Sequence, residues 1–169
     1  MLKIKKIVEL NKKTWYYIIS LNTERKDVHM LKGINNLLTP DLLKILMEMG
    51  HGDELVISDG NFPAASMANH LVRLDGNNVP EVLDAILGVF PLDQYVEEPV
   101  AYMDVVPGDD FVPVIWDEYR KIIDKYEPDT KIEHMERFAF YERAKKAYAV
   151  VYTSETSKYA NVILKKGCV

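Results

Sequence analysis

Cysteine is almost absent from this sequence: of 169 residues only Cys168, next to the last position, carries a thiol. No disulfide can therefore form within the chain. The sequence also lacks an apolar run long enough to cross a membrane, and the apolar segment 15–19 is too short for a secretory signal. We expect a cytoplasmic protein with no membrane partner.

The signatures of common cofactor and metal enzymes are missing as well. The sequence contains no glycine-rich phosphate loop, no HExxH, no CxxC and no GxSxG. His70 and His134 have no metal-ligand spacing with His51. We therefore expect no metal and no cofactor, which leaves acid–base chemistry by side chains, or simple binding.

Positive charge is scarce outside the first 29 residues. The net charge is −5 at pH 7, but residues 1–29 hold seven Lys/Arg against three acidic residues, so residues 30–169 carry −9. An acidic body argues against binding to a phosphate backbone, and we expect no nucleic-acid partner. Residues 1–29 form a basic N-terminal extension, read as an accessory arm or an upstream translation start, and residues 30–169 form one domain.

Helical and extended patterns alternate along that domain. Thr39-Pro40-Asp41 has the N-cap, the N1 proline and the first-turn acid of a helix start, and the spacing of Leu42, Leu43, Leu46 and Met47 predicts a core-facing side. The stretch 61–67 is expected to form a tight loop that leads into a short helix. Further helices are expected over 80–87, 115–126 and 137–144, and strands over 55–57, 71–74, 100–106, 132–135, 147–153 and 161–164. The alternation predicts a single α/β domain of three layers, with helices flanking a mixed, largely parallel sheet.

The stretch 49–60, Met-Gly-His-Gly-Asp-Glu-Leu-Val-Ile-Ser-Asp-Gly, joins the first helix to the first strand. We expect Gly50 in the left-handed conformation that closes a helix, and Gly52 at the turn into the strand. His51 then stands at a bend as a candidate proton carrier, although a histidine in a glycine-rich bend is more often a turn residue. Asp59 follows the strand, where loops of α/β proteins carry function.

Other polar residues also stand at element ends. An acid, amides, phenols and a guanidinium suit a polyhydroxylated small molecule, because they donate to and accept from its hydroxyl groups, and histidine can move a proton. The residues concerned are His51, Asp59, Asn61, Arg137, Tyr141, Tyr159 and Asn161. Tyr141 has an equally good interpretation as a packing residue.

From Met30 onward the chain resembles the L-fucose mutarotases, the FucU branch of the RbsD/FucU sugar-anomer family. The resemblance rests on Met-Gly-His-Gly-Asp-Glu at 49–54, Ser58-Asp59, Phe62-Pro63-Ala64, Arg-Phe-Ala-Phe-Tyr-Glu-Arg-Ala at 137–144, and Lys-Tyr-Ala-Asn at 158–161. It implies an RbsD-like fold, and an isomerase that interconverts the α and β anomers of L-fucose.

The resemblance also implies site residues and an assembly. His51 matches the family's proposed general acid, and the residues matched to sugar binding are Asp59, Arg137, Tyr159, Ala160 and Asn161. Family members form ring-shaped homo-oligomers, decamers in several cases, with sites near subunit boundaries. Two positions depart from the family pattern: Asn61 replaces a second histidine, and Ala160 replaces a glycine, which is harmless if its φ is negative.

Two other functions remain open at this stage. A D-ribose pyranase or mutarotase is the alternative within the family, although Gly52 and the stretch 137–143 look more like the fucose branch. A non-catalytic sugar-binding protein is the alternative in another class, because Asn61 removes one histidine from the expected pocket.

Overall fold

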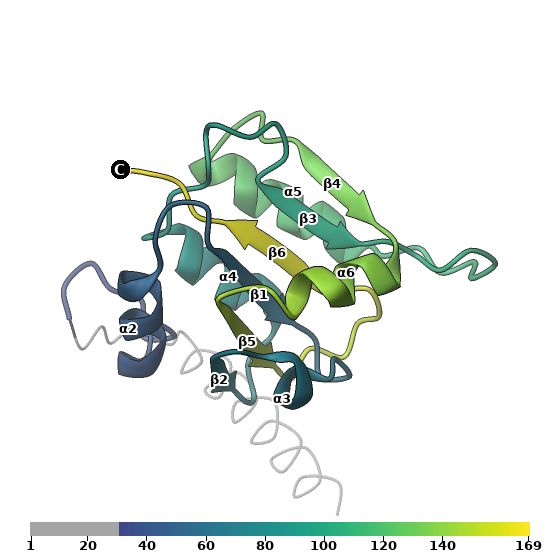
Figure 1. Ribbon diagram of the computed structural model, residues 1–169, viewed down its shortest axis with the longest axis horizontal. Helices are drawn as coiled ribbons and strands as arrows, with labels where there is room; N and C mark the ends of the chain where they lie inside the picture. Colours follow the sequence, from purple (N-terminus) through teal and green to yellow (C-terminus); the bar gives the residue numbers. More distant parts are fainter. Residues whose placement is uncertain (1–30) are drawn as a thin grey trace, which may run out of the picture. The chain divides into compact units, whose positions relative to one another are not determined.

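The computed structural model describes residues 31–169, and a six-stranded sheet forms the centre of the unit 37–169 (Figure 1). Residues 37–169 make up one compact unit, and the expected basic extension, residues 1–29, lies outside the described residues. In chain order the elements are α2 (Pro40–Glu48), β1 (Glu54–Ser58), α3 (Ala64–Met67), β2 (Leu71–Leu74), α4 (Val79–Leu87), β3 (Val100–Met103), α5 (Ile115–Tyr126), β4 (Ile132–Met135), α6 (Arg137–Ala144), β5 (Ala149–Thr153) and β6 (Val162–Lys165).

The strand order is β2-β5-β1-β6-β3-β4, and five of the six strands run in the same direction. Only β6 is antiparallel to its neighbours: Leu55 of β1 lies opposite Ala149 of parallel β5 on one side and Leu164 of β6 on the other. The expected mixed, largely parallel sheet is confirmed. Because β6 is reversed, its first residues lie at the same edge of the sheet as the carboxyl ends of β1 and β3.

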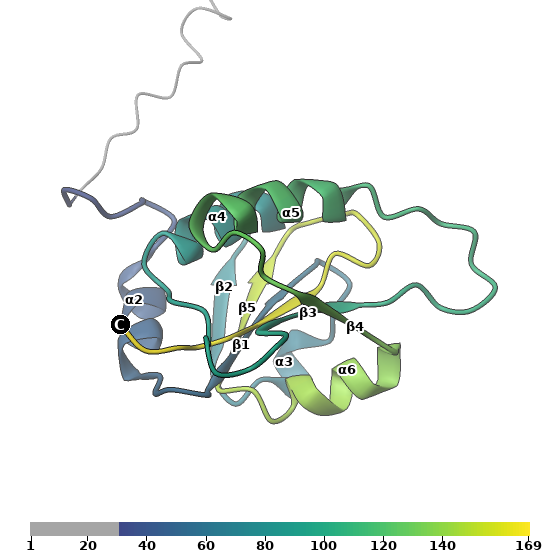
Figure 2. The same ribbon diagram turned by 90° about the horizontal axis from the view of Figure 1, so that it is seen from above.

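Helices cover both faces of this sheet, which gives the three expected layers. Figure 2 shows α4 and α5 on one face and α3 and α6 on the other. Leu55, Val56 and Ile57 of β1 are fully buried, because β1 is a central strand covered on both sides. No helix within residues 31–169 is long and apolar enough to cross a membrane.

The first helix begins as the sequence predicts. The Thr39 hydroxyl accepts a hydrogen bond from the Leu42 N–H at 3.3 Å, and Pro40 is the first helical residue. Leu42 and Leu46 are buried, but Met47 is 83% exposed, so its expected place on the core face is wrong. The buried side of this nine-residue helix is narrower than the sequence pattern suggested.

The end of α2 differs from the expectation for Gly50. Met49 adopts an extended conformation as the C-cap, and the left-handed φ falls on Gly52, at +87°, rather than on Gly50. The Gly50 N–H donates to Asp53 Oδ2 at 2.7 Å, so a side-chain-closed turn takes the place of a left-handed helix end. Gly52 provides the turn into β1, as expected.

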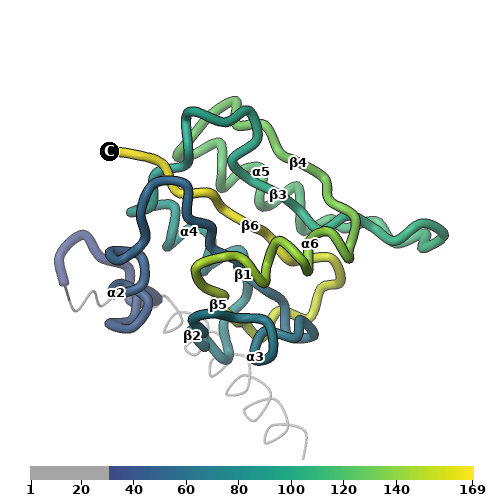
Figure 3. Tube along the Cα trace, viewed as in Figure 1, coloured from purple at the N-terminus to yellow at the C-terminus, as the bar shows by residue number. Residues whose placement is uncertain are grey.

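The strand expected over 100–106 is shorter in the structure and ends at Met103. The Asp104 N–H still bonds the Met135 carbonyl at 2.7 Å, but Asp104 Oδ1 accepts the Val105 N–H at 2.9 Å, which turns the chain away from the sheet. The following segment, up to α5, extends out from the body of the domain (Figure 3). This segment contributes to the pocket described next.

Candidate functional site

A pocket of about 220 Å³ lies at the edge of the sheet where β1 and β3 end and β6 begins. Ligands of open α/β sheets commonly bind at such an edge, outside the carboxyl ends of the strands. The lining residues are Asp59, Asn61, Phe62, Met103, Asp109, Tyr141, Lys158, Tyr159 and Asn161. Five of the residues selected from the sequence therefore lie together.

Asp59 and Asn161 form the buried floor of the pocket. Asn161 Nδ2 donates to Asp59 Oδ2 at 2.8 Å, and Asn161 Oδ1 accepts the Asp59 N–H at 3.0 Å. Burial raises the pKa of the Asp59 carboxyl above its usual value, and the hydrogen bonds from Asn61, Asn161 and Phe62 only partly offset it. Asp59 Oδ1 also accepts the Asn61 N–H at 2.9 Å, which holds the start of the Asn61 loop.

Tyr159 is held in a left-handed conformation, with φ of +57°, which is uncommon for a bulky residue. Its hydroxyl donates to Asp109 Oδ2 at 2.7 Å, and its carbonyl accepts Trp116 Nε1 at 2.8 Å. The hydrogen bond to Asp109 is the main reason that the pKa of Tyr159 lies above its usual value. Such a conformation persists only where its surroundings determine it, and it concentrates at functional sites.

Ala160 lies directly behind this tyrosine and is fully buried. Its carbonyl accepts the Tyr119 hydroxyl at 2.8 Å. Among the described residues, Asp129 and Tyr159 are the non-glycine residues with positive φ, so Ala160 is in an ordinary conformation. Alanine in place of glycine therefore causes no left-handed strain at this position.

Tyr141 and Asn61 complete the walls. The Tyr141 ring packs edge-on against Phe62, with ring centroids 5.5 Å apart, so it is both a packing residue and a lining residue. Asn61 is exposed at the mouth of the pocket. Its amide can donate to or accept from a ligand hydroxyl, but it cannot carry a proton as histidine does.

Arg137 begins α6 beside the pocket rather than among its lining residues. Its Cζ lies 4.6 Å from the centre of the Phe138 ring, and its charge opposes the rise in the pKa of Tyr159. Within residues 31–169 its buried Nε has no hydrogen-bond partner. A buried donor without a partner is unusual.

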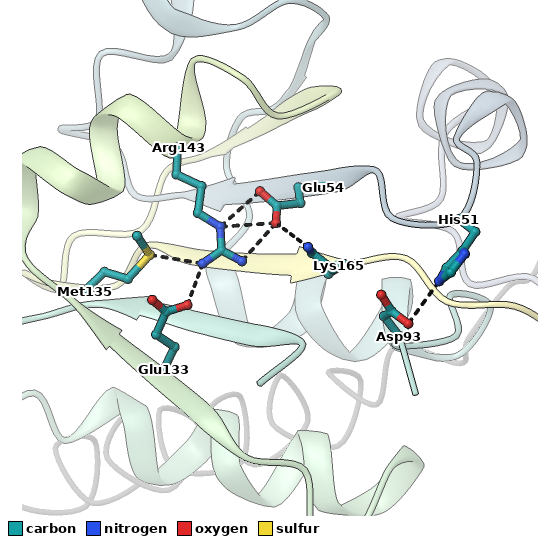
Figure 4. Close-up of polar contacts among 7 residues, drawn as sticks. All are labelled: His51, Glu54, Asp93, Glu133, Met135, Arg143 and Lys165. Carbon is teal, nitrogen blue, oxygen red and sulfur yellow. Dashed lines mark hydrogen bonds and ion pairs between the residues drawn. The ribbon is translucent and has the colours of Figure 1, made fainter. Parts of the chain in front are cut away.

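His51 lies at the opposite edge of the sheet from the pocket. His51 precedes β1 and Asp59 follows β1, so the five residues of this strand, which span roughly 16 Å, separate them. The imidazole Nε2 lies 3.1 Å from Asp93 Oδ1, and the side chain is 46% exposed (Figure 4). Within one chain, the structure does not bring His51 together with the other selected residues.

A second polar cluster lies between these two edges and has a structural role. Arg143 of α6 donates from Nε and Nη2 to Glu54, at 2.9–3.1 Å, and from Nη1 to Glu133 at 2.6 Å (Figure 4). Lys165 Nζ lies 3.5 Å from Glu54. The two arginines of the 137–144 motif thus differ in role. Arg143 ties α6 to β1 and β4, whereas Arg137 lies beside the pocket.

The sequence analysis missed Asp93, Asp109 and Lys158. Lys158 is the first residue of the stretch 158–161 noted above, and Asp109 follows β3 in the turn sequence Pro-Gly-Asp-Asp. Asp93 had no local signal. Within the described part of the chain, no three His, Cys, Asp or Glu side chains are placed to hold a metal ion.

Comparisons with known proteins identify the family of the chain. Residues 32–169 match the RbsD / FucU transport protein family. The chain is 53% identical over 139 residues to an L-fucose mutarotase of Actinobacillus pleuropneumoniae serotype 5b, which covers 82% of this chain and 96% of that protein.

Solved structures have the same fold. The fucose mutarotase of Streptococcus pneumoniae, crystallised with L-fucose, is 56% identical to this chain and superposes on it with a TM-score of 0.79. The match covers 82% of this chain and 99% of that one. Bacillus subtilis RbsD, solved with D-ribose, is 24% identical with a TM-score of 0.61, covering 78% and 95%, a likeness of fold alone.

Proposed function

Because the chain belongs to the RbsD / FucU transport protein family, we propose that it interconverts the α and β anomers of L-fucopyranose. The observation that carries this proposal is the pocket at the end of β1, in a chain 56% identical to a protein crystallised with L-fucose. A volume of about 220 Å³ lies below the range of about 300–1,000 Å³ typical of drug-sized ligands. It suits a ligand of monosaccharide size.

Mutarotation requires one proton to leave the anomeric hydroxyl and one to reach the ring oxygen. The C1–O5 bond then breaks, its electron pair goes to the ring oxygen, and the sugar opens to the free aldehyde. Rotation about the bond to C1 and reclosure give the other anomer. General acid–base catalysis of about a hundred- to ten-thousand-fold is sufficient for such a reaction.

The pocket residues suit the task of holding the sugar. Asp59 presents a buried carboxylate with lone pairs beyond those used by Asn61 and Asn161, and the amide of Asn161 is fixed by Asp59. Tyr159 and Asp109 offer a phenol and a second carboxylate, and Arg137 has a free Nε. In this proposal the residues that bind the hydroxyl groups of the sugar are Asp59, Asp109, Arg137, Tyr159 and Asn161. Asn61 and Tyr141 close the mouth of the pocket, and Ala160 shapes the backbone.

The proton carrier in this proposal is His51, which must come from a neighbouring copy because it lies at the far edge of its own sheet. Exposed apolar side chains support contact at both edges: Val112, Val114 and Phe138 near the pocket, and Met47, Tyr95 and Val96 near His51. Contact of one edge with the other is head-to-tail, and such contacts form a ring when the rotation between copies closes. We propose a ring-shaped homo-oligomer, a decamer as in the family, with each site shared by two copies.

Mixing two inactive variants tests the shared site. His51→Ala removes the proton carrier but leaves the pocket, and Asp59→Ala damages the pocket but leaves His51. If each site draws on two copies, rings reassembled from equal amounts should recover about a quarter of the activity by random pairing. No recovery in rings that native mass spectrometry shows to contain both variants would contradict the shared site.

The first experiment on the reaction is saturation-transfer NMR of L-fucose at anomeric equilibrium, with D-ribose measured beside it. We expect enhanced exchange between the α and β signals of fucose, which disappears in His51→Ala. His70→Ala is the matched control, because His70 is exposed and packs on Tyr148 away from the pocket.

A non-catalytic sugar-binding protein is the second candidate, because Asn61 stands where the family pattern has a second histidine. Fucose that shifts the protein signals while anomer exchange stays at the buffer rate would establish this candidate. Faster exchange with ribose than with fucose would instead indicate a ribose enzyme.

We also propose a cytoplasmic location, supported by the exposed free thiol of Cys168, which a reducing compartment keeps unpaired. Fractionation of cells producing the protein tests this. Recovery outside the cytoplasmic fraction would contradict it.

A further inference from the structure

A buried carboxylate stands behind the exposed His51 and takes no part in the pocket. Asp93 is only 4% exposed, and its Oδ1 lies 3.1 Å from His51 Nε2 and accepts the Tyr95 N–H at 3.0 Å. The Tyr95 ring lies edge-on to the imidazole, with centroids 5.5 Å apart. A buried acid is normally paired, and the partner here is the residue assigned to proton transfer.

The C-terminal segment fixes both members of this pair. The Asp93 N–H donates to the Lys165 carbonyl at 3.0 Å, and Leu92 forms a bridge with Lys166. On the other side, the Gly52 N–H donates to the Lys166 carbonyl at 2.8 Å. The histidine and the acid, 42 positions apart in sequence, are therefore both attached to the segment formed by Lys165 and Lys166.

Lys166 also holds the helix that leads to His51. Its Nζ donates to the Leu46 carbonyl at 2.7 Å and to the Met49 carbonyl at 2.6 Å, which satisfies carbonyls at the end of α2. Asp53 Oδ2 closes the turn around His51 by accepting the Gly50 N–H. Both the backbone and the ring of His51 are thus held.

The pairing decides which imidazole nitrogen is free. Hydrogen bonding to the Tyr95 N–H and to His51 keeps the pKa of Asp93 below its usual value, so the group is an ionised carboxylate near neutral pH. A carboxylate only accepts hydrogen bonds, so Nε2 must carry the proton. Nδ1 remains as the nitrogen with a free lone pair, on a side chain that is 46% exposed.

We propose that Asp93 is a positioning residue, which holds His51 with Nε2 protonated and leaves Nδ1 to exchange protons with the sugar. The inference rests on the proposed role of His51. Nδ1 takes the proton of the anomeric hydroxyl, the C1–O5 electron pair moves to the ring oxygen, and that oxygen takes the proton back from Nδ1. Between the two transfers, the Asp93 carboxylate pairs with the imidazolium.

The test compares Asp93→Ala and Asp93→Asn, each in the wild-type and the His51→Ala background of the full-length protein. Asparagine keeps an oxygen for Tyr95 and His51 but removes the charge, so it also serves if the alanine variant fails to fold. We expect Asp93→Ala to lower kcat for fucose exchange about tenfold to a hundredfold, within the range of general acid–base effects, with KM changed less than about twofold. In the His51→Ala background the same substitution should cause no further loss.

A spectroscopic reading separates positioning from general damage. Long-range ¹H–¹⁵N NMR of His51 should show the Nε2–H form alone in the wild type and both neutral forms in Asp93→Ala. Asp75→Asn is the matched control, because Asp75 is an exposed carboxylate paired with Arg73. It should leave both the kinetics and the His51 signals unchanged.

Three results would overturn the proposal. Full kcat in both Asp93 variants, while His51→Ala is inactive, would exclude Asp93 and leave the proposed function intact. Loss of activity in both Asp93 variants while His51 keeps the Nε2–H form alone would show that Asp93 acts on the fold instead. Full activity of His51→Ala would overturn the role of His51, and this inference with it.

Discussion

Asp59 and Asn161 hold each other through two hydrogen bonds, one to the backbone and one to the side chain of Asp59, across 102 positions of sequence. Both residues are at least 96% buried. The pair joins the carboxyl end of β1 to the residue before β6. It is at once a structural clasp and the floor of the pocket.

Replacing Asn161 tests the clasp. Asn161→Ala leaves the buried Asp59 N–H and Oδ2 without these partners, and we expect it to lower the free energy of unfolding by about 2–4 kcal/mol, because each unpaired buried group costs about 1–3 kcal/mol. Urea unfolding measures this. Asn69→Ala is the control, since Asn69 likewise makes two hydrogen bonds, in its case to the Lys145 and Ala147 carbonyls, but is exposed, so a smaller loss is expected. Equal losses in the two variants would contradict a special role for the clasp.

The raised pKa of Asp59 predicts a pH dependence of stability. Between the unfolded value of 3.8 and the higher folded value, the folded protein binds a proton that the unfolded chain has lost. The contribution of the Asp59 carboxyl to the free energy of unfolding is therefore fully present below pH 3.8 and is lost as the pH rises through the folded pKa. Relative to Asp59→Asn, the wild type should become less stable over that window. The comparison uses unfolding free energies from pH 3 upward, and a difference that stays constant with pH would refute the raised pKa.

Gly167 allows the C-terminal segment to approach Leu92 and Asp93. A Cβ at position 167 would lie 2.7 Å from the Leu92 carbonyl carbon and 2.9 Å from Asp93 Cα, against backbone that cannot yield cheaply. We expect Gly167→Ala to destabilise the fold by about 1–3 kcal/mol and to shift the His51 signals, since Asp93 must move. Gly50→Ala is the control in the same region, because its Cβ would meet only Asp53 Oδ2, at 3.7 Å. Comparable stability of both variants in thermal unfolding would contradict the close approach.

Arg143 is expected to affect stability rather than sugar binding. Arg143→Met leaves Glu54 and Glu133 without their cation at a site where the Arg143 and Glu54 side chains are 20% and 15% exposed. We expect a loss of about 2–4 kcal/mol in the free energy of unfolding, with the KM for fucose unchanged. Arg73→Met is the control: it breaks an exposed pair with Asp75 and should change little. A raised KM with unchanged stability would place Arg143 in the site instead.

Much of the fold was predictable from local patterns. The Thr39-Pro40 helix start, the alternation of helices and strands, and the position of Asp59, Tyr159 and Asn161 at element ends depend on neighbours within a few residues. Such signals come from capping, periodicity and turn chemistry, and they are local by nature. The same local reasoning predicted the left-handed residue at Gly50, whereas the structure has it at Gly52. The reason is that the Asp53 side chain accepts the Gly50 N–H and closes the turn.

What the sequence by itself determined is the set of elements and the chemical character of the site: an acid, amides, phenols and a histidine suited to a sugar. The tertiary structure decided where they meet. It placed reversed β6 between β1 and β3, which brings Asn161 to Asp59, and it placed His51 beside Asp93 at the other edge. No local pattern encodes these pairs, because their partners are 42 and 102 residues apart and meet only when the sheet assembles around its core.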